Sequence, residues 1–372
     1  MRALMTATVP SMIGQFNMNN IKLLQELGYE VDVACSIHDH TVWSEEKISE
    51  FKKQLENIGV NIYDIEFSRS PFQFFNHLRS YKSILRLMNV QEYDLIHTHT
   101  PISSLITRVA YRRSKIYSSC KMIYTAHGFH FFKGNSPIKN LLFRNIEKIG
   151  ARYTDVLITI NKEDYVAAKQ FHLKNGGSIE YVPGVGIDLE KIDSIFGMRT
   201  QLLQDLHLPD DSILMLSVGE LNDNKNHRLV IETLSHLPGK YHYLICGVGP
   251  LMEQHKTLAE SLGVQDRLHM LGYRNDVLSI MKSCDLFVFP SKREGLSVAL
   301  MEALACGMPC IASNIRGNTD LIGDMSGILF NSADELEKGI LQISQLPHRG
   351  KDNIKKYDLH SISNQMRSIY EC

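Results

Sequence analysis

Short apolar runs alternate with longer amphipathic segments along the whole of this 372-residue chain. Such alternation is typical of parallel α/β proteins, because consecutive parallel strands are joined by a crossover that is usually a helix. Strands are expected in the first half at residues 2–8, 31–35, 60–65, 94–97, 121–125 and 156–160. Strands are expected in the second half at residues 213–219, 241–247, 267–271, 285–290, 309–313 and 327–330. The pattern predicts an α/β protein with two doubly wound, Rossmann-like domains.

A Gly-rich segment at residues 174–188 breaks this alternation, as a hinge or a domain linker would. We therefore expect a first domain over 1–180, a second over 181–355, and a C-terminal helix over 356–372 that crosses back to the first domain. Doubly wound sheets bind ligands outside the carboxyl ends of their strands. A central cleft faced by both domains would then hold a nucleotide on one side and a second substrate on the other.

The composition excludes several classes of protein. A formal net charge of −1 gives no global signal for nucleic-acid binding. Seven cysteines form no C-x-x-C pair and are expected to be reduced, as in a cytoplasmic protein. No apolar run reaches the roughly 18 residues that a membrane span needs. The chain is therefore expected in the cytoplasm, either free or peripheral on the inner face of the membrane.

Two glutamates mark a candidate site in the second half. Residues 297–306 have the pattern of an apolar helix, yet Glu302 lies in its middle, and Glu294 precedes it in a loop. A buried carboxylate should be paired or should contact a ligand, although Glu302 could instead lie on a partly exposed helix. Two carboxylates could accept hydrogen bonds from the hydroxyls of two sugars. A diphosphate between those sugars would face the peptide N–H groups at the helix start, those of Gly295, Leu296 and Ser297.

Other loops of the second half add to this site. Lys225 is expected at a helix N-terminus, where a cation needs a nearby anion because the helix dipole disfavours it. Gly247 and Gly249 in "CGVGP" would allow a close approach of backbone, although a plain turn has the same pattern. Tyr273 and Arg274 in "LGYRNDV" would close the pocket, where main-chain groups could contact a base.

The order of "SVGELNDNKNH", "CGVGP", "LGYRNDV", "PSKREGLSVALMEALACGMP" and "RGNTDLI" resembles the C-terminal domain of glycosyltransferase family 4. These are retaining enzymes of the GT-B fold, and an E-x7-E element, here Glu294 and Glu302, is their hallmark. The resemblance implies that Glu294 contacts the transferred sugar, Glu302 the ribose hydroxyls and Lys225 the diphosphate. Many members have Arg where this chain has Glu220, so a second cation would come from elsewhere, such as Arg293 or Arg316.

The first half supplies further candidates. Gly14 lies between the first strand and a helix, and its backbone could approach the diphosphate. By the resemblance, His127 in "AHGFHFFKG" faces the donor sugar. His97, His99 and His130 are nearby in the predicted fold, and a zinc site is the alternative. No Cys or acid stands at ligand spacing beside them, so no metal ligand is assigned.

The expected function is transfer of a hexose or N-acetylhexosamine from a nucleotide sugar, most simply a UDP-sugar, with retention at the anomeric carbon. The acceptor would be a carbohydrate, free or carried on a lipid pyrophosphate. The residues of several motifs resemble those of bacterial enzymes of exopolysaccharide and capsule synthesis. No D-x-D occurs in the chain, so neither a metal nor another cofactor is expected to be required. The alternatives are a nucleotide-sugar epimerase of related fold and a non-catalytic sugar-nucleotide sensor.

A basic region in the first half suggests a membrane surface as a partner. Between His99 and Arg152 ten Lys/Arg residues accompany a single acid, Glu147. An acceptor on a lipid pyrophosphate at an anionic bilayer would explain this charge, although an ordinary solvated helix face would also do so. The apolar contact is expected from six nearby side chains, those of Phe129, Phe131, Phe132, Leu141, Leu142 and Phe143.

Overall fold

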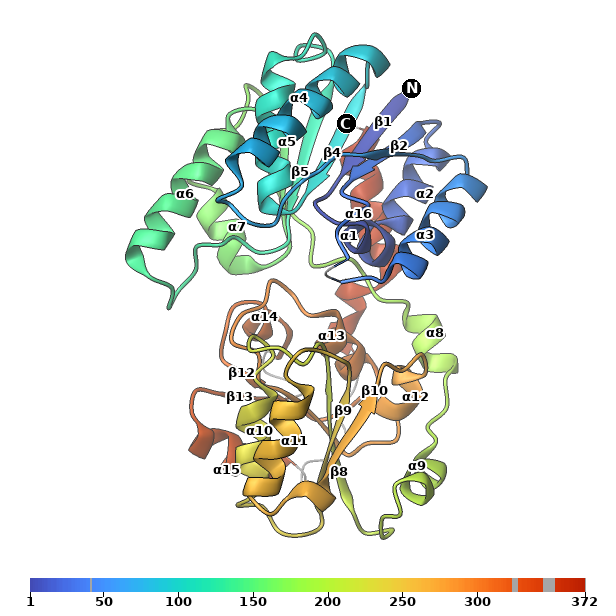
Figure 1. Cartoon of the computed structure of the whole chain (residues 1–372), viewed down its shortest axis with the longest axis vertical. Helices are drawn as coiled ribbons and strands as arrows, with labels where there is room; N and C mark the ends of the chain where they lie inside the picture. Colours follow the sequence, from blue (N-terminus) through green and yellow to red (C-terminus); the bar gives the residue numbers. More distant parts are fainter. Residues whose placement is uncertain (41, 323–326, 344–351, 372) are drawn as a thin grey trace. The chain divides into compact units, whose positions relative to one another are not determined.

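The computed structural model describes residues 1–40, 42–322, 327–343 and 352–371 (Figure 1). They form two compact units, one of residues 1–185 together with 362–372 and the other of residues 186–361. The chain thus leaves the first unit five residues after the expected boundary at 180 and returns to it at Ile362.

The first unit is built on a parallel seven-stranded sheet with the strand order β3-β2-β1-β4-β5-β6-β7. Met5 in the central strand β1 is in register with Val33 of β2 and His97 of β4. The edge strand β7 pairs with β6 and lies within the Gly-rich segment 174–188. The strands are β1 (Arg2–Thr6), β2 (Glu30–Cys35), β3 (Asn61–Asp64), β4 (Leu95–His99), β5 (Lys121–Ala126), β6 (Val156–Thr159) and β7 (Ser178–Tyr181).

Side chains alternate between the two faces of this sheet and so build two cores. Leu4 and Ile96 pack under helices α4 and α5, whereas Ala3 and Met5 pack on the opposite side with α1, α2 and α3. Figure 1 shows α4, α5 and α6 together on one face of the sheet. The helices of this unit are α1 (Pro10–Phe16), α2 (Met18–Glu26), α3 (Glu45–Asn57), α4 (Phe74–Gln91), α5 (Pro101–Arg113), α6 (Pro137–Ala151) and α7 (Lys162–Ala168).

The C-terminal helix α16 (Leu359–Glu371) completes the first unit. Its buried residues Ile362, Met366 and Tyr370 recur every four positions, so one face of the helix is apolar. This face packs into the core beside β1 and β2. The last residues of the chain thus stabilise the unit in which the chain begins.

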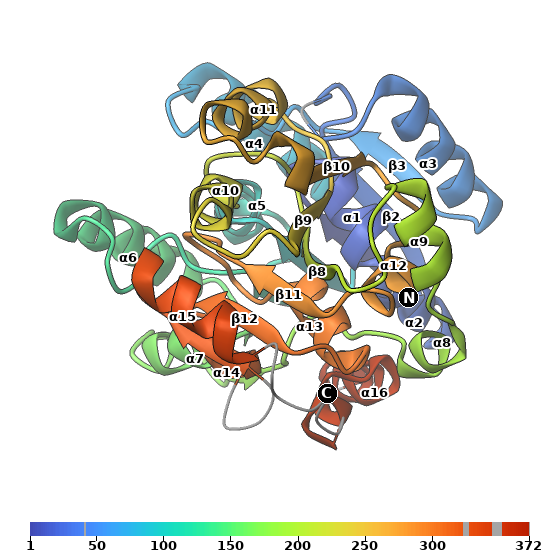
Figure 2. The same ribbon diagram turned by 90° about the horizontal axis from the view of Figure 1, so that it is seen from below.

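The second unit is built on a parallel six-stranded sheet with the strand order β10-β9-β8-β11-β12-β13. Figure 2 shows β9, β8, β11 and β12 next to one another in this order. The two sheets confirm the predicted fold class of two doubly wound α/β units. The strands are β8 (Ile213–Val218), β9 (Tyr241–Cys246), β10 (Leu268–Gly272), β11 (Leu286–Phe289), β12 (Cys310–Ser313) and β13 (Gly327–Phe330).

Helices cover both faces of the second sheet. Leu216 and Phe287 face the core that contains α13, and Met215 and Val288 face the core that contains α10. The strand order reverses between β8 and β11, and ligands of doubly wound sheets bind at such a switch point. The helices are α8 (Leu189–Ser194), α9 (Arg199–Asp205), α10 (His227–Leu234), α11 (Met252–Ser261), α12 (Val277–Met281), α13 (Val298–Ala305), α14 (Asn318–Ile322) and α15 (Ala333–Ile343).

Candidate active site

Two loops meet at the switch point of the second sheet, one after β8 and one after β11. The backbone N–H of Lys292 donates to the carbonyl oxygen of Asn224 at 2.8 Å, and the Asn224 side chain donates to that of Arg293 at 3.0 Å. The Asn226 side chain donates to the carbonyl oxygen of Pro290 at 3.3 Å. The polar side chains of both loops are therefore held in fixed positions relative to each other.

Lys225 and Glu294 form an ion pair across these two loops. The Lys225 Nζ lies 2.8 Å from Glu294 Oε1, and the side chains are 21% and 14% exposed. The same ammonium lies 4.8 Å from the centre of the Phe289 ring. The carboxylate compensates a cation that the N-terminus of α10 would disfavour. The structure brings together two predicted site residues that the sequence did not connect.

Glycines let the neighbouring backbone approach this pair. A Cβ at Gly247 would lie 1.9 Å from the carbonyl oxygen of Gly219, and one at Gly249 would lie 2.6 Å from the backbone nitrogen of Leu221. The predicted close approach of backbone is present, but the approaching group is the loop after β8. Contact of Gly247 and Gly249 with a nucleotide stays a prediction.

Glu302 lies in the middle of α13, between buried Met301 and Ala303. Burial raises the pKa of its carboxyl to about 7, and the nearby Lys191 acts in the opposite direction. Among the described residues its carboxylate has no hydrogen bond or ion pair. A carboxylate that is largely desolvated and unpaired is suited to accept hydrogen bonds from a ligand.

A second cation, Arg316, lies in the loop after β12 and contacts the loop that precedes α13. Arg316, which is 8% exposed, donates from Nε to the carbonyl oxygen of Glu294 at 3.2 Å. Gly317 has a φ of +80°, and a Cβ there would lie 2.3 Å from the carbonyl oxygen of Gly295. Ser297 caps the helix by accepting from the Leu300 N–H at 3.3 Å. Arg316 is thus in contact with the loop that carries Glu294.

The other predicted residues of this unit are more exposed. Glu220 and Arg293 are both exposed to solvent. Tyr273 is 75% exposed. Arg274 holds Asp276 with two hydrogen bonds of 2.8 and 2.6 Å, which raise the pKa of the guanidinium and lower that of the carboxyl. Contact of Tyr273 and Arg274 with a base stays a prediction.

Three histidines form a group at the carboxyl end of the first sheet. His127 follows β5, and its Nε2 lies 3.1 Å from Nδ1 of His99 at the end of β4. The rings of His97 and His99 are 4.1 Å apart. The Nδ1 of His97 contacts the Tyr370 hydroxyl, and its Nε2 contacts the Thr125 hydroxyl, each at 2.8 Å. His127 is therefore in contact with the imidazole of His99, which in turn packs against that of His97.

These imidazoles are neutral near pH 7. Burial lowers the pKa of His97 to about 3 and that of His127 to about 4, and it also lowers the pKa of His99. His130 lies apart from them, with its ring against Phe143. Within the described residues no group of three or more His, Cys, Asp or Glu side chains is placed to hold a metal. That the reaction needs no metal stays a prediction.

Gly14 lies inside the short helix α1, which follows β1 and precedes α2. A Cβ at this position would lie 2.3 Å from Cη2 of Trp43 and 3.1 Å from the Phe51 ring. The packing of α1 on α3 therefore accounts for the glycine. Its contact with a diphosphate stays a prediction.

Comparison with known proteins identifies the family. Residues 14–191 match the model described as Glycosyltransferase Family 4, and residues 198–358 match that described as Glycosyl transferases group 1. EpsD of Bacillus subtilis, named as a glycosyltransferase, is 33% identical over 94% of this chain and 88% of its own length. The chain belongs to glycosyltransferase family 4.

Two further comparisons extend this result. A galactosyltransferase of Escherichia coli, named for UDP-Gal and an α-D-GlcNAc-diphosphoundecaprenol acceptor, is 30% identical over 72% of this chain and 70% of its own. The crystal structure of HepE from Anabaena with UDP and glucose superposes with a TM-score of 0.75 at 18% identity, covering 100% of this chain and 99% of HepE. The family 4 chain thus has the GT-B fold.

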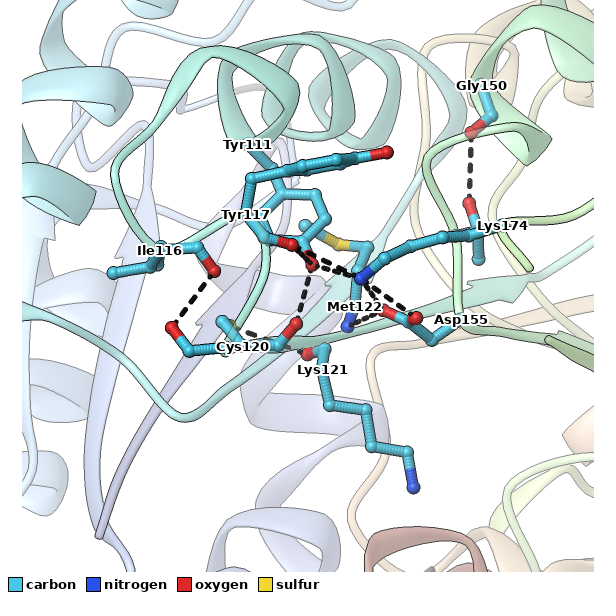
Figure 3. Close-up of polar contacts among 11 residues, drawn as sticks. Tyr111, Ile116, Tyr117, Cys120, Lys121, Met122, Gly150, Asp155 and Lys174 are labelled. Atoms are coloured by element: carbon cyan, nitrogen blue, oxygen red, sulfur yellow. Dashed lines mark hydrogen bonds and ion pairs between the residues drawn. The ribbon is translucent and has the colours of Figure 1, made fainter. Parts of the chain in front are cut away.

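A cavity of the first unit lies away from the histidines, near the amino ends of β5, β6 and β7. It has a volume of about 880 Å³ and is bordered by Lys121, Asp155, Lys174 and residues of α16. Figure 3 shows the Lys174 ammonium directed at Asp155 and Tyr117, and the ammonium lies 3.0 Å from the Asp155 carboxylate. Since ligands of such sheets bind at the carboxyl ends of strands, this cavity is not the candidate site.

Part of the basic region of this glycosyltransferase is buried. The Arg108 guanidinium lies 3.1 Å from the Glu147 carboxylate, and both side chains are almost fully buried. Phe129 and Phe131 are 1% and 3% exposed, so the prediction that they contact a membrane was wrong. They stack in the core below α6, as alternate residues of an extended segment can. Of the other four expected contacts, Leu141 and Leu142 are exposed, whereas Phe132 and Phe143 are half-buried.

Sequence reasoning missed some residues of the site. Thr100 has a φ of +63°, and its hydroxyl accepts from the Thr8 N–H at 3.0 Å at the switch point of the first sheet. His99 contacts His127 at 3.1 Å, and the charge of Lys191 acts to lower the pKa of Glu302. The alternation in "IHTHT" already places His97 and His99 on one face of a strand, whereas no sequence signal links Lys191 to Glu302.

None of the described helices is both long and apolar enough to span a bilayer.

Proposed function

We propose that this family 4 enzyme transfers a hexosyl or N-acetylhexosaminyl group from a UDP-sugar to a carbohydrate carried on a lipid diphosphate, with retention at the anomeric carbon. The observation that carries the proposal is the Lys225–Glu294 pair at the switch point of the second sheet, followed on α13 by Glu302, whose carboxylate has no hydrogen bond or ion pair among the described residues. The UDP in the HepE structure and the acceptor named for the Escherichia coli relative support the classes of donor and acceptor.

Each part of the donor has a partner of suitable chemistry. The Glu302 carboxylate accepts from the ribose hydroxyls, and Glu294 accepts from a hydroxyl of the transferred sugar. The diphosphate takes Lys225, the N–H groups of residues 295–297 and Arg316, which replaces the Arg that many family members have at the position of Glu220. When the donor binds, the Lys225 ammonium exchanges its contact with the Glu294 carboxylate for a contact with a phosphate. It therefore stays paired with an anion.

The reaction breaks the bond between the anomeric carbon and the diphosphate oxygen and forms a bond from that carbon to the acceptor oxygen. Positive charge develops on the sugar and negative charge on the leaving diphosphate, which Lys225 and Arg316 stabilise. The proton of the acceptor hydroxyl passes to an oxygen of the leaving diphosphate. Because the chain has no D-x-D motif, these side chains and helix N–H groups supply the stabilisation without a required metal.

His127 contributes a neutral imidazole to the sugar side of the reaction. Its depressed pKa keeps it uncharged above about pH 4, so it can donate or accept a hydrogen bond without opposing the cationic sugar. The bond from His99 leaves one ring nitrogen of His127 free to face the donor.

The enzyme would act in the cytoplasm, peripheral on the inner face of the membrane, in the synthesis of a surface polysaccharide. Helix α6 supports this location, since Ile138, Leu141 and Leu142 are exposed beside Lys139 and Arg144. Exposed apolar side chains next to cations are typical of helices that lie in the interface of an anionic bilayer.

A donor screen tests the proposal. The purified enzyme is incubated with UDP-glucose, UDP-galactose, UDP-N-acetylglucosamine or UDP-N-acetylgalactosamine, with and without lipid diphosphate-linked sugars. UDP release should depend on the acceptor, and the new linkage should keep the anomeric configuration of the donor in the NMR spectrum. Acceptor-independent conversion of one UDP-sugar to its epimer would identify an epimerase, and binding without turnover would identify a sensor.

A further inference from the structure

A group of exposed apolar side chains marks the start of α4. Phe72, Phe74 and Phe75 are 91%, 70% and 77% exposed, and Leu78 is 41% exposed. The rings of Phe74 and Phe75 lie edge to face, 6.0 Å apart. Single exposed apolar residues are ordinary on protein surfaces, but three neighbouring phenylalanines that expose most of their area mark a contact surface. These four residues are called the phenylalanine cluster.

Among the described residues of its own unit, the phenylalanine cluster has no apolar cover. The surface beside it is a polar cavity of about 630 Å³, lined in part by Glu66, Arg69, Gln73, Asn76 and Arg79. This lining is polar, so it offers the rings little apolar area to pack against. The rings are therefore available to an apolar partner outside the unit.

The charge around the phenylalanine cluster favours an anionic partner. Residues 67–91 contain Arg69, Arg79, Lys82 and Arg86 and no Asp or Glu. Arg79 is held near Glu66 at 3.4 Å, and Lys82 and Arg86 are exposed on the same helix. Aromatic side chains flanked by cations are the composition of protein segments that enter the interface of an anionic bilayer.

The position of the phenylalanine cluster relates it to α6. Each crossover helix of a parallel sheet begins near the carboxyl edge and runs back to the amino edge, where the next strand begins. The first residues of α4 and of α6 are therefore at the same edge of the sheet, and both helices cover the same face (Figure 1). The exposed Ile138, Leu141 and Leu142 lie in the first turns of α6. His127 follows β5 at this same edge.

We propose that the phenylalanine cluster inserts into the headgroup and upper acyl region of an anionic bilayer. Together with the start of α6, it turns the carboxyl edge of the first sheet towards the membrane. This inference rests on the proposed lipid-linked acceptor for its purpose, since it puts His127 on the side from which such an acceptor arrives. A flat anionic surface, rather than a protein, fits two apolar groups that are carried by separate helices within one basic face.

A single tryptophan probe tests the insertion and the orientation together. Trp43 is the one tryptophan of the chain, so Trp43→Phe gives a background without indole fluorescence. Phe75→Trp in that background is compared with Val90→Trp. Val90 is 67% exposed at the far end of the same helix, about 22 Å away at 1.5 Å per residue. Vesicles of phosphatidylglycerol and phosphatidylcholine carry bromine on the acyl chains.

Bromine should quench the fluorescence of the Phe75→Trp protein and leave that of the Val90→Trp protein unchanged. Equal quenching of both probes would contradict the orientation. A Phe75→Trp protein that sediments with the vesicles but is not quenched would show that another surface binds them. A protein that does not sediment with anionic vesicles at low salt would overturn the proposal entirely.

Replacing the rings provides a second test. Phe72, Phe74 and Phe75 are changed together to Ser, which should weaken vesicle binding about tenfold or more, because each ring loses most of its transfer free energy. The matched control changes Arg112, Arg113 and Lys115 to Ser. These exposed cations belong to the end of α5 or follow it, at the opposite edge of the sheet, so their loss should have the smaller effect. A larger loss in the control would contradict the proposal.

The affinity for UDP separates this inference from the proposed function. The triple phenylalanine variant should bind UDP as the wild type does, since Lys225, Glu302 and Arg316 belong to the other unit. If the wild type binds vesicles but no UDP, the proposed function fails and the membrane surface stands. If it binds UDP but no vesicles, the membrane surface is contradicted and the proposed function stands.

Discussion

Lys225 and Glu294 are 69 positions apart in the chain, and their charged groups lie 2.8 Å apart. The pair joins the loops after β8 and β11, the two strands between which the order of the second sheet reverses. In the protein without a ligand the two charges compensate each other. A diphosphate sugar can then take the ammonium at its phosphates and the carboxylate at its sugar, so the pair prepares both groups for one ligand.

Loss of the Lys225 charge should weaken UDP binding. Lys225→Met removes a charge-assisted hydrogen bond, worth about 1.5–3 kcal/mol or roughly tenfold or more in affinity. Lys292→Met is the matched control, because Lys292 lies in the partner loop and pairs with the exposed Asp223. Calorimetric titration with UDP measures both variants. Equal losses in both would show that the effect is only that of net charge.

The stability of the protein without ligand should fall as the pH rises through the titration of Glu302. Burial raises the pKa of this carboxyl from 4.5 to about 7. Below pH 4.5 it is neutral in both the folded and the unfolded state. Above that pH the unfolded state ionises first, so the free energy of unfolding decreases until about pH 7, by about 3 kcal/mol at most.

Glu302→Gln should therefore stabilise the protein at pH 8 and have little effect at pH 4.5. Denaturant unfolding at the two pH values measures the difference. Glu232→Gln makes the same chemical change at a more exposed glutamate, on α10, and is the control. A Glu302→Gln protein with the same stability difference at both pH values would contradict the raised pKa.

Transfer should continue in the presence of EDTA. The diphosphate is proposed to be stabilised by Lys225, Arg316 and the N–H groups at the start of α13, none of which a chelator affects. The initial rate with the donor found in the screen is measured with and without EDTA. Loss of activity that Mn²⁺ or Mg²⁺ restores would contradict this mechanism.

A basic residue at position 220 should strengthen the binding of the UDP diphosphate. Glu220 is exposed beside the loop that carries Lys225, and Glu220→Arg would place a cation where many family members have one. UDP should bind more tightly and uridine should not. Glu220→Gln separates the loss of the negative charge from the gain of the positive one. Unchanged UDP affinity in Glu220→Arg would place this side chain outside the pocket.

The sequence predicted the two parallel sheets because strand and helix periods are local properties. It also placed Glu294 in a loop and Glu302 on a helix after one strand, since both follow the apolar run of β11. It did not predict the Lys225–Glu294 pair, because that contact depends on β8 and β11 being neighbours. The order of strands in a sheet is decided by tertiary packing rather than by local pattern.

The burial of aromatic residues was also not predictable from the sequence. Phe129 and Phe131 and the exposed Phe72 and Phe74 share the same alternating spacing beside basic residues. The first two fill a core below α6, and the other two project from the start of α4. Which of two similar patterns faces the core depends on the volume left between helices and sheet, and a single sequence does not specify that volume.

In the proposed site Glu302 binds the ribose of the donor, and Glu294 binds the sugar that is transferred. UDP and the intact UDP-sugar are titrated at pH 8 into the wild type, Glu302→Gln and Glu294→Gln. The account predicts that Glu302→Gln weakens UDP and the UDP-sugar about tenfold or more, whereas Glu294→Gln spares UDP and weakens only the UDP-sugar. Equal losses of UDP affinity in the two variants, or no loss in Glu302→Gln, would contradict it.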